Sequence, residues 1–537
     1  MMNSLASSNN QSWLSWFLRG ILILLFLILL TKLFEIQIIK GDYYRTLSQE
    51  NRIRHVPIPA PRGQILASGG EVLAGNVGIQ KRIIFSEQSG FTISDDLTDA
   101  TLEEMVTDYK RVYPLGDVAA HAVGYLSVVG SGEIGKIDPN CPDKGPFNLG
   151  DLVGTTGLEE HYDCQLRGIP GEELIEVNTS GHEVRVLGRR DPIPGQDLKT
   201  TIDYNLQSLV ASNMGGKKGG VIVTNPQGQI LAFYSSPSFD PTNLVPSLTD
   251  SNLPLLDRVV SGTFHPGSVF KPIVAIAALE EGAIDKNFIF NDPGVINVNG
   301  FSYKNWYFTE YGRTEGNIGL VRAIARSTDT FFYKVGQMVG PDAIAKWADK
   351  FGLNAPTGID IPGETEGLIP TPEWKQATKD ESWFLGDTYH MAIGQGDVSI
   401  TPVELNTYIS GIAEGGKICQ PTFDAASSAV CHTVAVSKNN LDLIKQGMED
   451  ACSTGGTAFT FFDFAATHNG MQVACKTGTA EVETDGIPHA WFTFFAPADN
   501  PQIVVTVLFE RGGEGSSVAG PVARTIANEY FSSQSSQ

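Results

Sequence analysis

The stretch TFHPGSVFKP, residues 263–272, places a serine and a lysine three positions apart where a long apolar run begins. The run from Val269 to Glu281 is rich in alanine and isoleucine and predicts a helix. A spacing of three brings Ser268 and Lys271 to one face of that helix, within contact range. Pro272 fits the first helical turn, where its missing N–H costs nothing.

A serine hydroxyl becomes a nucleophile only when a base lies beside it. Lys271 can serve as that base only in its neutral form, which requires burial or a second cation nearby. The pair has a simpler explanation, a helix cap followed by a solvated lysine. A serine and a lysine at this spacing occur by chance about twice in a chain of this length, so further motifs are needed.

A second motif lies in ARSTDTFFYKVG, residues 325–336, where Ser327, Thr328 and Asp329 stand at the start of another predicted helix. A hydroxyl at this point could relay a proton between a base and a leaving group. The alternative is an ordinary helix N-cap, because serine and aspartate are preferred there.

The third motif is ACKTGTAEV, residues 474–482, inside a run with strand character. Lys476 would supply the second cation beside Lys271. Gly478 has no side chain, so a substrate backbone can approach the strand and add to its edge. All three motifs in this order, on a helix, a helix start and a strand, are typical of penicillin-binding proteins and class A β-lactamases.

The segments around these motifs predict an α+β fold. Residues 219–241 give two strands around an Asn-Pro-Gln-Gly turn, a hairpin. Helical runs follow, then three strands and one closing helix, which together predict an antiparallel sheet with helices packed on its faces. The helical runs are expected at residues 269–281, 319–337, 402–413 and 439–451, and the closing helix at 520–531.

The N-terminal part begins with FLRGILILLFLILLTKLFEIQIIKG, residues 17–41, an apolar segment that predicts one uncleaved membrane anchor. A cleaved signal peptide is the alternative, but no small-residue cleavage site follows the run. Arg19, with no acidic residue before it, favours a cytoplasmic N-terminus. Residues from about 40 to 190 are mixed and punctuated by glycine and proline, and "DPIPGQDL" at 191–198 resembles a linker.

Composition excludes some classes of protein. The 38 basic and 60 acidic residues give a net charge of −22, which argues against nucleic acid as a partner. The six cysteines show no C-x-x-C spacing, which argues against a zinc site. Two cysteine pairs each bracket a loop-like stretch and could be disulfides outside the cytoplasm or buried free thiols: Cys419 with Cys431, and Cys452 with Cys475.

The chain resembles a class B penicillin-binding protein, a peptidoglycan transpeptidase, over nearly its whole length. The resemblance rests on RGQIL, GTTGLEEHYDCQLRG, TTIDYNLQ, SSPSFDP, FHPGSVFKP, GDTYHMAIGQGDVSITPVEL and KTGTAE in the family's usual order. Asp329 stands where many relatives have asparagine, and this form resembles the elongation-type, rod-shape branch. FNDPGVINVNG and TGIDIPGETEGLIPTPEWK favour the same branch. Ala67 departs from the pattern, which usually continues with aspartate there.

The resemblance implies a role for each motif. Ser268 would attack the carbonyl between the two D-alanines of a stem peptide, with Lys271 as base and Ser327 as proton shuttle beside Asp329. Backbone N–H groups of Ser268 and Thr479 would form the oxyanion hole. Lys476, Thr477 and Thr479, with Gly478 between the threonines, would bind the substrate carboxylate. An amine from a neighbouring stem would close the cross-link, and β-lactams would be trapped as acyl esters. No cofactor and no metal are implied.

The resemblance also implies an organisation and partners. We expect a single-pass protein of the cytoplasmic membrane, with its catalytic domain on the extracytoplasmic side and a membrane-embedded glycan polymerase as partner, because no glycan-polymerising domain is evident. The fold expected is a penicillin-binding, serine β-lactamase-like domain behind a mostly β pedestal of the dimerisation type. The segments are 1–15, a cytoplasmic segment; 16–39, the anchor; 40–195, the pedestal; and 196–537, the transpeptidase domain.

Three alternatives stay open. A division-type transpeptidase of the same family would carry the same motifs. A β-lactamase or D,D-carboxypeptidase would share the fold, but Glu404 in TPVELN does not match the deacylating loop of class A enzymes. A non-catalytic β-lactam sensor or scaffold would be expected to have more membrane segments, or to have lost the nucleophile or Lys476.

Overall fold

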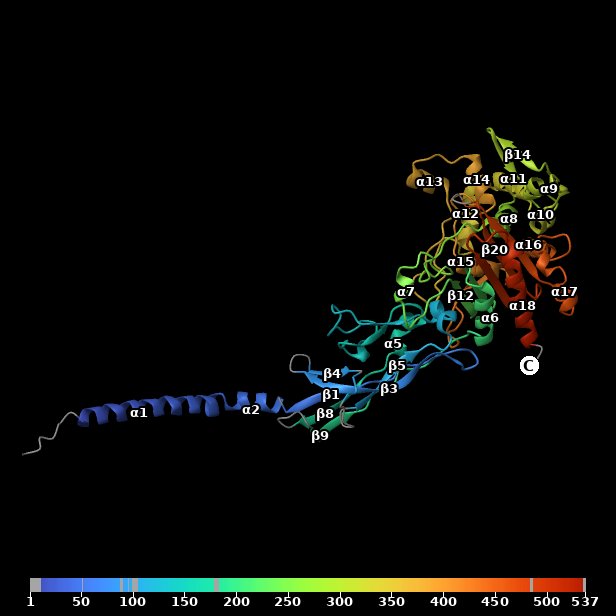
Figure 1. The fold of residues 1–537 in the computed structure, drawn as a ribbon. Helices are drawn as coiled ribbons and strands as arrows, with labels where there is room; N and C mark the ends of the chain where they lie inside the picture. The colour runs from blue at the N-terminus through green and yellow to red at the C-terminus, as the bar shows by residue number, and fades with distance from the viewer. Residues whose placement is uncertain are drawn as a thin grey trace, which may run out of the picture. The chain divides into compact units, whose positions relative to one another are not determined.

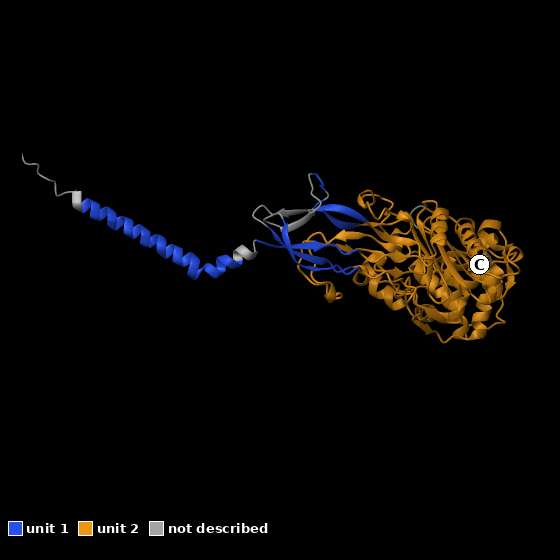
Figure 2. Cartoon of the chain, turned by 90° about the horizontal axis from the view of Figure 1, so that it is seen from below, with its two compact units in different colours: residues 1–61, 78–109, 168–194 blue, residues 62–77, 110–167, 195–537 orange. Residues whose placement is uncertain are grey.

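The chain forms two compact units in the computed structural model, which describes residues 11–50, 52–86, 90–94, 96–98, 105–177, 183–482 and 486–534 (Figure 2). Unit 1 contains residues 1–61, 78–109 and 168–194, and unit 2 contains residues 62–77, 110–167 and 195–537. Segments from the first 195 residues belong to both units, so the single boundary expected at residue 195 stays a prediction.

Unit 1 begins with the apolar helix α1 (Gln11–Phe34), the π-helical turn η1 (Glu35–Ile39) and α2 (Gly41–Glu50). Within the span Trp13–Ile39, an 18-residue window has a mean hydropathy of 2.4, and none of that window is buried. A helix this long and this apolar can cross a bilayer, as expected for the segment 16–39. Lys32 and Lys40 pair with Glu35 near its end, at 2.7 and 2.9 Å.

The rest of unit 1 is built of strands, as expected for a mostly β pedestal. One antiparallel sheet has the order β1–β8–β9. In a second sheet the long strand β3 pairs with β5, and its last residues, Arg82–Ser86, pair with β4. The bounds are β1 (Ile53–Ile58), β3 (Val72–Ser86), β4 (Gly90–Ser94), β5 (Met105–Val112), β8 (Gly171–Val177) and β9 (Glu183–Arg190).

Unit 2 is organised around one five-stranded antiparallel sheet of order β12–β11–β21–β20–β19. The predicted hairpin of β11 and β12 and the three closing strands are confirmed, and β19, which carries Lys476, lies at the sheet edge. The bounds are β11 (Gly219–Thr224), β12 (Ile230–Ser236), β19 (Ala474–Ala480), β20 (His489–Ala496) and β21 (Ile503–Phe509).

Helices cover both faces of this sheet, so its central strands are apolar on both sides. Along β20, Phe492 and Phe494 pack in a cluster with residues of α6 (Tyr204–Met214) and α18 (Gly520–Gln534). The alternate residues Trp491 and Phe495 pack on the other face, where the helical layer lies (Figure 1). That layer contains α8 (Lys271–Glu280), α10 (Leu320–Arg326), α11 (Asp329–Val339), α12 (Pro341–Lys350), α14 (Leu385–Ala392), α15 (Pro402–Ala413) and α16 (Lys438–Ala451).

Two predicted helices differ from the observed ones at the motifs. The run at 269–281 begins as a 3₁₀ turn, η5 (Gly267–Phe270), before α8 starts at Lys271. The run at 319–337 is two helices, because Ser327 adopts a left-handed conformation with φ +54° that ends α10. Thr328 is extended and leads into α11. Both interruptions lie at residues singled out for chemistry.

The shorter elements of unit 2 complete the framework. Small two-stranded pairs are β6 (Leu126–Val128) with β7 (Leu152–Gly154), β13 (Phe290–Asp292) with β16 (Gly316–Ile318), β14 (Val295–Val298) with β15 (Phe301–Lys304), and β17 (Lys417–Cys419) with β18 (Cys431–Thr433). The strand β2 (Ile65–Leu66) pairs with the parallel β10 (Leu198–Lys199) and, antiparallel, with the start of β3. Short helices are α3 (Ala120–Val123), α4 (Gly157–His161), α5 (Asp163–Leu166), α7 (Val245–Leu248), α9 (Trp306–Tyr311), α13 (Pro372–Lys379) and α17 (Phe464–Thr467).

Two motifs quoted for the resemblance meet in a buried ion cluster of unit 2. Arg62 of RGQIL donates through Nε to Glu159 of GTTGLEE at 2.6 Å, and Arg111 donates to the same carboxylate at 2.7 Å. Glu159 is fully buried, so removing it would leave two buried arginines without this partner. Ala67 is also fully buried in this core, where it packs among apolar residues.

Three disulfides link the six cysteines. Cys419 pairs with Cys431, and Cys452 pairs with Cys475, which resolves the alternative of free thiols for both. A third disulfide, Cys141 with Cys164, was not predicted. Disulfides are typical of a compartment outside the reducing cytoplasm.

Candidate active site

Ser268 lies in the 3₁₀ turn η5, which packs against the edge strand β19. Gly267 has φ +56°, and a Cβ there would lie 2.8 Å from the carbonyl oxygen of Thr479. The Gly267 N–H donates to the carbonyl of Gly394 at 2.8 Å. The turn is therefore fixed between β19 and the AIGQG segment. A residue larger than glycine at position 267 would not permit this close contact. Ser268 itself is half-buried.

Gly478 has a structural reason for its missing side chain that the sequence did not indicate. A Cβ at this position would lie 2.9 Å from the carbonyl oxygen of Pro266 and 3.0 Å from both Val269 Cγ1 and Trp491 Cβ. The strand thus makes room for the turn that carries the serine. The predicted reason, close approach of a substrate backbone, remains a prediction.

Lys271, Ser327, Asp329 and Lys476 are brought together in one buried polar cluster. Lys271 Nζ donates to the carbonyl oxygen of Ser327 at 2.7 Å, to Ser327 Oγ at 3.2 Å and to Asp329 Oδ1 at 2.6 Å. Lys476 Nζ donates to Ser327 Oγ at 2.9 Å and to the carbonyl of Thr477 at 2.9 Å. Both lysines are fully buried. The hydroxyl of Ser327 therefore joins the two amines.

The break between α10 and α11 is what places Ser327 in this position. Its φ of +54° is uncommon for a residue other than glycine, and such conformations persist where the surroundings fix them. A continuous helix would hold the Ser327 carbonyl in its own hydrogen-bond ladder. The left-handed turn instead leaves the carbonyl and the hydroxyl of one residue available to Lys271 Nζ.

Burial sets the electrostatics of the two lysines. Burial lowers the pKa of Lys271, and the neighbouring Asp329 carboxylate acts in the opposite direction. Burial and then the charge of Lys271 lower the pKa of Lys476 well below its usual range, again opposed by Asp329. Two buried amines share one carboxylate, so burial and the repulsion between the two charges both favour the loss of one proton from this pair.

The expected hydrogen bond between nucleophile and base is not made in this conformation. In the part of the chain that the structure describes, no hydrogen bond joins Ser268 Oγ to Lys271 Nζ, and Lys271 makes its side-chain hydrogen bonds to Ser327 and Asp329. An ammonium group has three protons, and the three contacts use them all. Catalytic hydrogen bonds often form only in the complex with substrate.

The two threonines of the third motif lie on the edge strand with different exposure. Thr477 is buried, and its hydroxyl donates to Thr457 Oγ1 at 3.0 Å. Thr479 is exposed, and its hydroxyl accepts from the Gly515 N–H at 3.4 Å. The strand edge beside Ser268 is thus open to a ligand at Thr479.

Three residues near the catalytic motifs were missed by sequence reasoning. The backbone N–H of Trp306 donates to Asp329 Oδ2 at 2.9 Å. Asn305 Oδ1 accepts from the backbone N–H of Asp329 at 3.1 Å. Asn305 in turn donates to Asp292. In the sequence, FNDPGVINVNG favours one branch of the family, and no local pattern connects it with the second motif.

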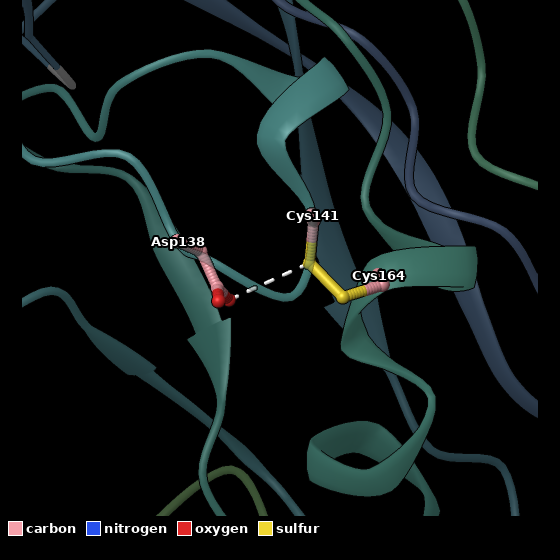
Figure 3. A group of neighbouring side chains, drawn as sticks. All are labelled: Asp138, Cys141 and Cys164. Atoms are coloured by element: carbon pink, nitrogen blue, oxygen red, sulfur yellow. Dashed lines mark hydrogen bonds between the residues drawn. A yellow bond between two sulfur atoms is a disulfide. The ribbon is translucent and has the colours of Figure 1, made fainter.

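Among the residues that the structure describes, one side-chain group has the spacing of a metal site, and it contains a disulfide. Asp138, Cys141 and Cys164 lie within 4.8 Å of one another, but the two sulfur atoms are bonded to each other (Figure 3). Cys141 Sγ lies 3.4 Å from Asp138 Oδ2. A metal binds thiolates, which a disulfide does not offer.

Two family models match the chain. "Penicillin binding protein transpeptidase domain" covers residues 219–528, and "Penicillin-binding Protein dimerisation domain" covers residues 86–200. Among curated proteins, the chain is 30% identical to "Peptidoglycan D,D-transpeptidase MrdA" of Acinetobacter baumannii, over 94% of this chain and 85% of the relative. The protein of the same name from Escherichia coli is also 30% identical, over 94% of this chain and 92% of its own.

Solved structures agree with these matches. The penicillin-binding protein PBP2 of Helicobacter pylori, in complex with MreC, aligns with a TM-score of 0.76 at 25% identity, over 89% of this chain and 99% of its own. The PBP2 of Pseudomonas aeruginosa, in complex with WCK 5153, aligns with a TM-score of 0.71 at 29% identity, over 89% and 96%. The fold, the order of the motifs and the relatives agree: this chain belongs to the penicillin-binding protein transpeptidases, in the class B, rod-shape branch.

Proposed function

We propose that this chain is a peptidoglycan D,D-transpeptidase of cell-wall elongation that acts through an acyl ester on Ser268. The position of Ser327 Oγ supports the roles assigned to these residues. This oxygen lies 2.9 Å from Lys476 Nζ and 3.2 Å from Lys271 Nζ. Lys271 follows Ser268 by three residues in the sequence. A hydroxyl between two buried amines of lowered pKa is suited to pass a proton.

In the first half of the reaction, neutral Lys271 takes the proton of Ser268 Oγ as the oxygen attacks the carbonyl between two D-alanines. A C–O bond forms and the peptide C–N bond breaks. Ser327 delivers a proton to the leaving amine of the terminal D-alanine and is reprotonated from the amines beside it. The donor stem stays on Ser268 as an ester.

In the second half, an amine of a neighbouring stem attacks the ester. It loses its proton to the same lysine cluster, a new amide C–N bond forms, and Ser268 Oγ regains its proton. No oxidant and no cofactor enter this balance. The Ser268 and Thr479 N–H groups would stabilise the oxyanion in both halves, a large contribution in acyl transfer. The turn and the strand lie close together at Gly267 and Thr479, which supports that pairing.

Glu404 is not placed to act as the deacylating carboxylate that the hydrolase alternative requires. This side chain caps α15, where its oxygens accept from the N–H groups of Thr401 at 2.7 Å and Gly367 at 2.8 Å. It is 1% exposed. A carboxylate committed to backbone donors is not available to position a deacylating water, so we infer slow deacylation and a long-lived acyl ester.

For the cellular setting, we infer a cytoplasmic N-terminus, the anchor at 16–39 and catalysis on the outer side of the membrane. The three disulfides support an oxidising compartment for the chain beyond the anchor. A chain from a structure described as "Structural coordination of polymerization and crosslinking by a peptidoglycan synthase complex" aligns over 98% of this chain, with a TM-score of 0.73 at 28% identity. That likeness supports a membrane-embedded glycan polymerase as partner.

The test is a time course of labelling by a fluorescent penicillin on the detergent-solubilised full chain, with Ser268→Ala beside it and free drug followed by mass spectrometry. We expect stoichiometric label that persists in the wild type and is lost in the variant. Label that disappears while the drug is steadily hydrolysed would favour a hydrolase. Label retained by Ser268→Ala would place the nucleophile elsewhere.

A further inference from the structure

Asp292, at the end of β13, is a buried carboxylate that the proposed mechanism does not use. It is 2% exposed, and in the described ranges it makes no ion pair. Oδ1 accepts from Thr330 Oγ1 at 2.5 Å and from the Gly294 N–H at 2.9 Å. Oδ2 accepts from Asn305 Nδ2 at 3.2 Å and from the Glu315 N–H at 2.9 Å. Four donors converge on it, so its position is fixed.

Asn305 is the link between this carboxylate and the catalytic cluster. It is fully buried, and its amide spans two partners: Nδ2 donates to Asp292, and Oδ1 accepts from the backbone N–H of Asp329 at 3.1 Å. The orientation of the amide is determined, because a carboxylate only accepts and a backbone N–H only donates. An isosteric side chain without both functions could not serve both partners.

The same segment holds Asp329 by a second contact. The N–H of Trp306, the next residue, donates to Asp329 Oδ2 at 2.9 Å, while Oδ1 faces Lys271 Nζ at 2.6 Å. The backbone of Asn305 is tied to Gly294 by an N–H···O bond of 2.9 Å, which closes the base of the β14–β15 hairpin. Asp329 is thus located by its backbone and its carboxylate together.

We propose that Asn305, oriented by Asp292, is a positioning residue that fixes the Asp329 carboxylate against Lys271 and so sets the geometry of the proton-transfer cluster. The inference rests on the proposed function, because it gives the cluster its catalytic meaning. The hydrogen-bond path runs from Asp292 through the Asn305 amide to the start of α11, without touching substrate. A displacement of about 1 Å in such a group can reduce a rate about 100-fold.

The test compares the full chain and variants by the rate constant of acylation with a fluorescent penicillin, measured across pH, together with thermal unfolding. Asn305→Asp places two carboxylates face to face and removes the donor to Asp292. We expect acylation to fall about 100-fold and the acid limb of its pH profile to move. Asp292→Asn combined with Asn305→Asp restores one donor and one acceptor between the two positions, and should recover at least part of the lost rate.

Asn317→Ala is the matched control. Asn317 lies in the small sheet of β13 and β16, where it forms an exposed amide pair with Asn291 at 2.8 Å. Its replacement should leave the acylation rate and its pH profile unchanged. The proposal is overturned if Asn305→Asp alters the unfolding temperature alone, or if the double variant recovers nothing in rate or in pH profile. These results are distinguishable from failure of the proposed function, in which the wild type itself would show no labelling that depends on Ser268.

Discussion

Lys476 Nζ donates a 2.9 Å hydrogen bond to Ser327 Oγ, which joins the edge strand of the sheet to the break between two helices. The same hydroxyl lies 3.2 Å from Lys271 Nζ. Three sequence motifs thus converge on one oxygen atom. The Asp329 carboxylate, which faces Lys271, balances part of the charge of the two amines.

Asp329→Asn should move the acid limb of the acylation pH profile to lower pH. The carboxylate opposes the lowering of the Lys271 pKa by burial. Without it, the pKa of Lys271 falls further and the neutral amine is present at lower pH. The measurement is the rate constant of acylation by a fluorescent penicillin from pH 5 to pH 10, with wild type in parallel. A limb that stays in place or moves to higher pH would contradict the assignment of Lys271 as base.

Lys476→Ala should slow acylation by about 10² to 10⁴, because Ser327 loses a proton-transfer partner. Lys476→Arg should not restore the rate. The site is fully buried, and a guanidinium is planar, larger and permanently charged. Both variants are compared with wild type by stopped-flow acylation. An arginine variant within a few-fold of wild type would show that only a positive charge is needed at this position.

Gly478→Ala should displace the turn that carries Ser268. The new methyl group would lie 2.9 Å from the carbonyl oxygen of Pro266 and 3.0 Å from Val269 Cγ1, so the turn or the strand must shift. We expect a loss of about 1 to 3 kcal/mol in unfolding free energy and slower acylation. Gly132→Ala is the control, because nothing lies within 4 Å of a Cβ there. Equal behaviour of the two variants in both assays would refute the packing argument.

Removal of the Cys452–Cys475 disulfide should affect both stability and acylation. Cys475 precedes Lys476 on β19, and Cys452 ends α16, so the bond ties the catalytic strand to the helical layer. Replacing both cysteines by alanine should cost about 3 kcal/mol of unfolding free energy. The Cys419–Cys431 pair, which joins β17 to β18, provides the comparison.

Removal of the Cys419–Cys431 disulfide should cost a similar unfolding free energy but should change acylation little. The hairpin of β17 and β18 does not carry a catalytic motif. Chemical denaturation and penicillin labelling of the folded fraction measure the two effects. If the two double variants acylate at the same rate, the strand does not depend on the Cys452–Cys475 bond for its position.

Local patterns predicted much of the fold because they depend on neighbours in the chain. The hairpin of β11 and β12 follows from two β-rich runs around a turn, and the strand carrying Lys476 follows from a run with strand character. Polar residues at 326–330 interrupt the run from 319 to 337, and the second motif predicted a helix start there, but the left-handed conformation of Ser327 was not predicted. Its left-handed conformation is maintained by contacts with lysines that come from distant segments.

The sequence by itself determined the order of the three motifs and the apolar span of the N-terminal helix, and it predicts Ser268 as nucleophile with Lys271 as base. Each of these depends on residue type and spacing within one segment. Only the tertiary structure decided how the segments meet. Ser327 lies between two lysines, and Gly478 packs against the turn that carries Ser268. Cys141 is bonded to Cys164, and Asn305 lies between Asp292 and Asp329. Hydrogen bonds of about 3 Å between distant segments form only after the core has packed, so no local pattern records them.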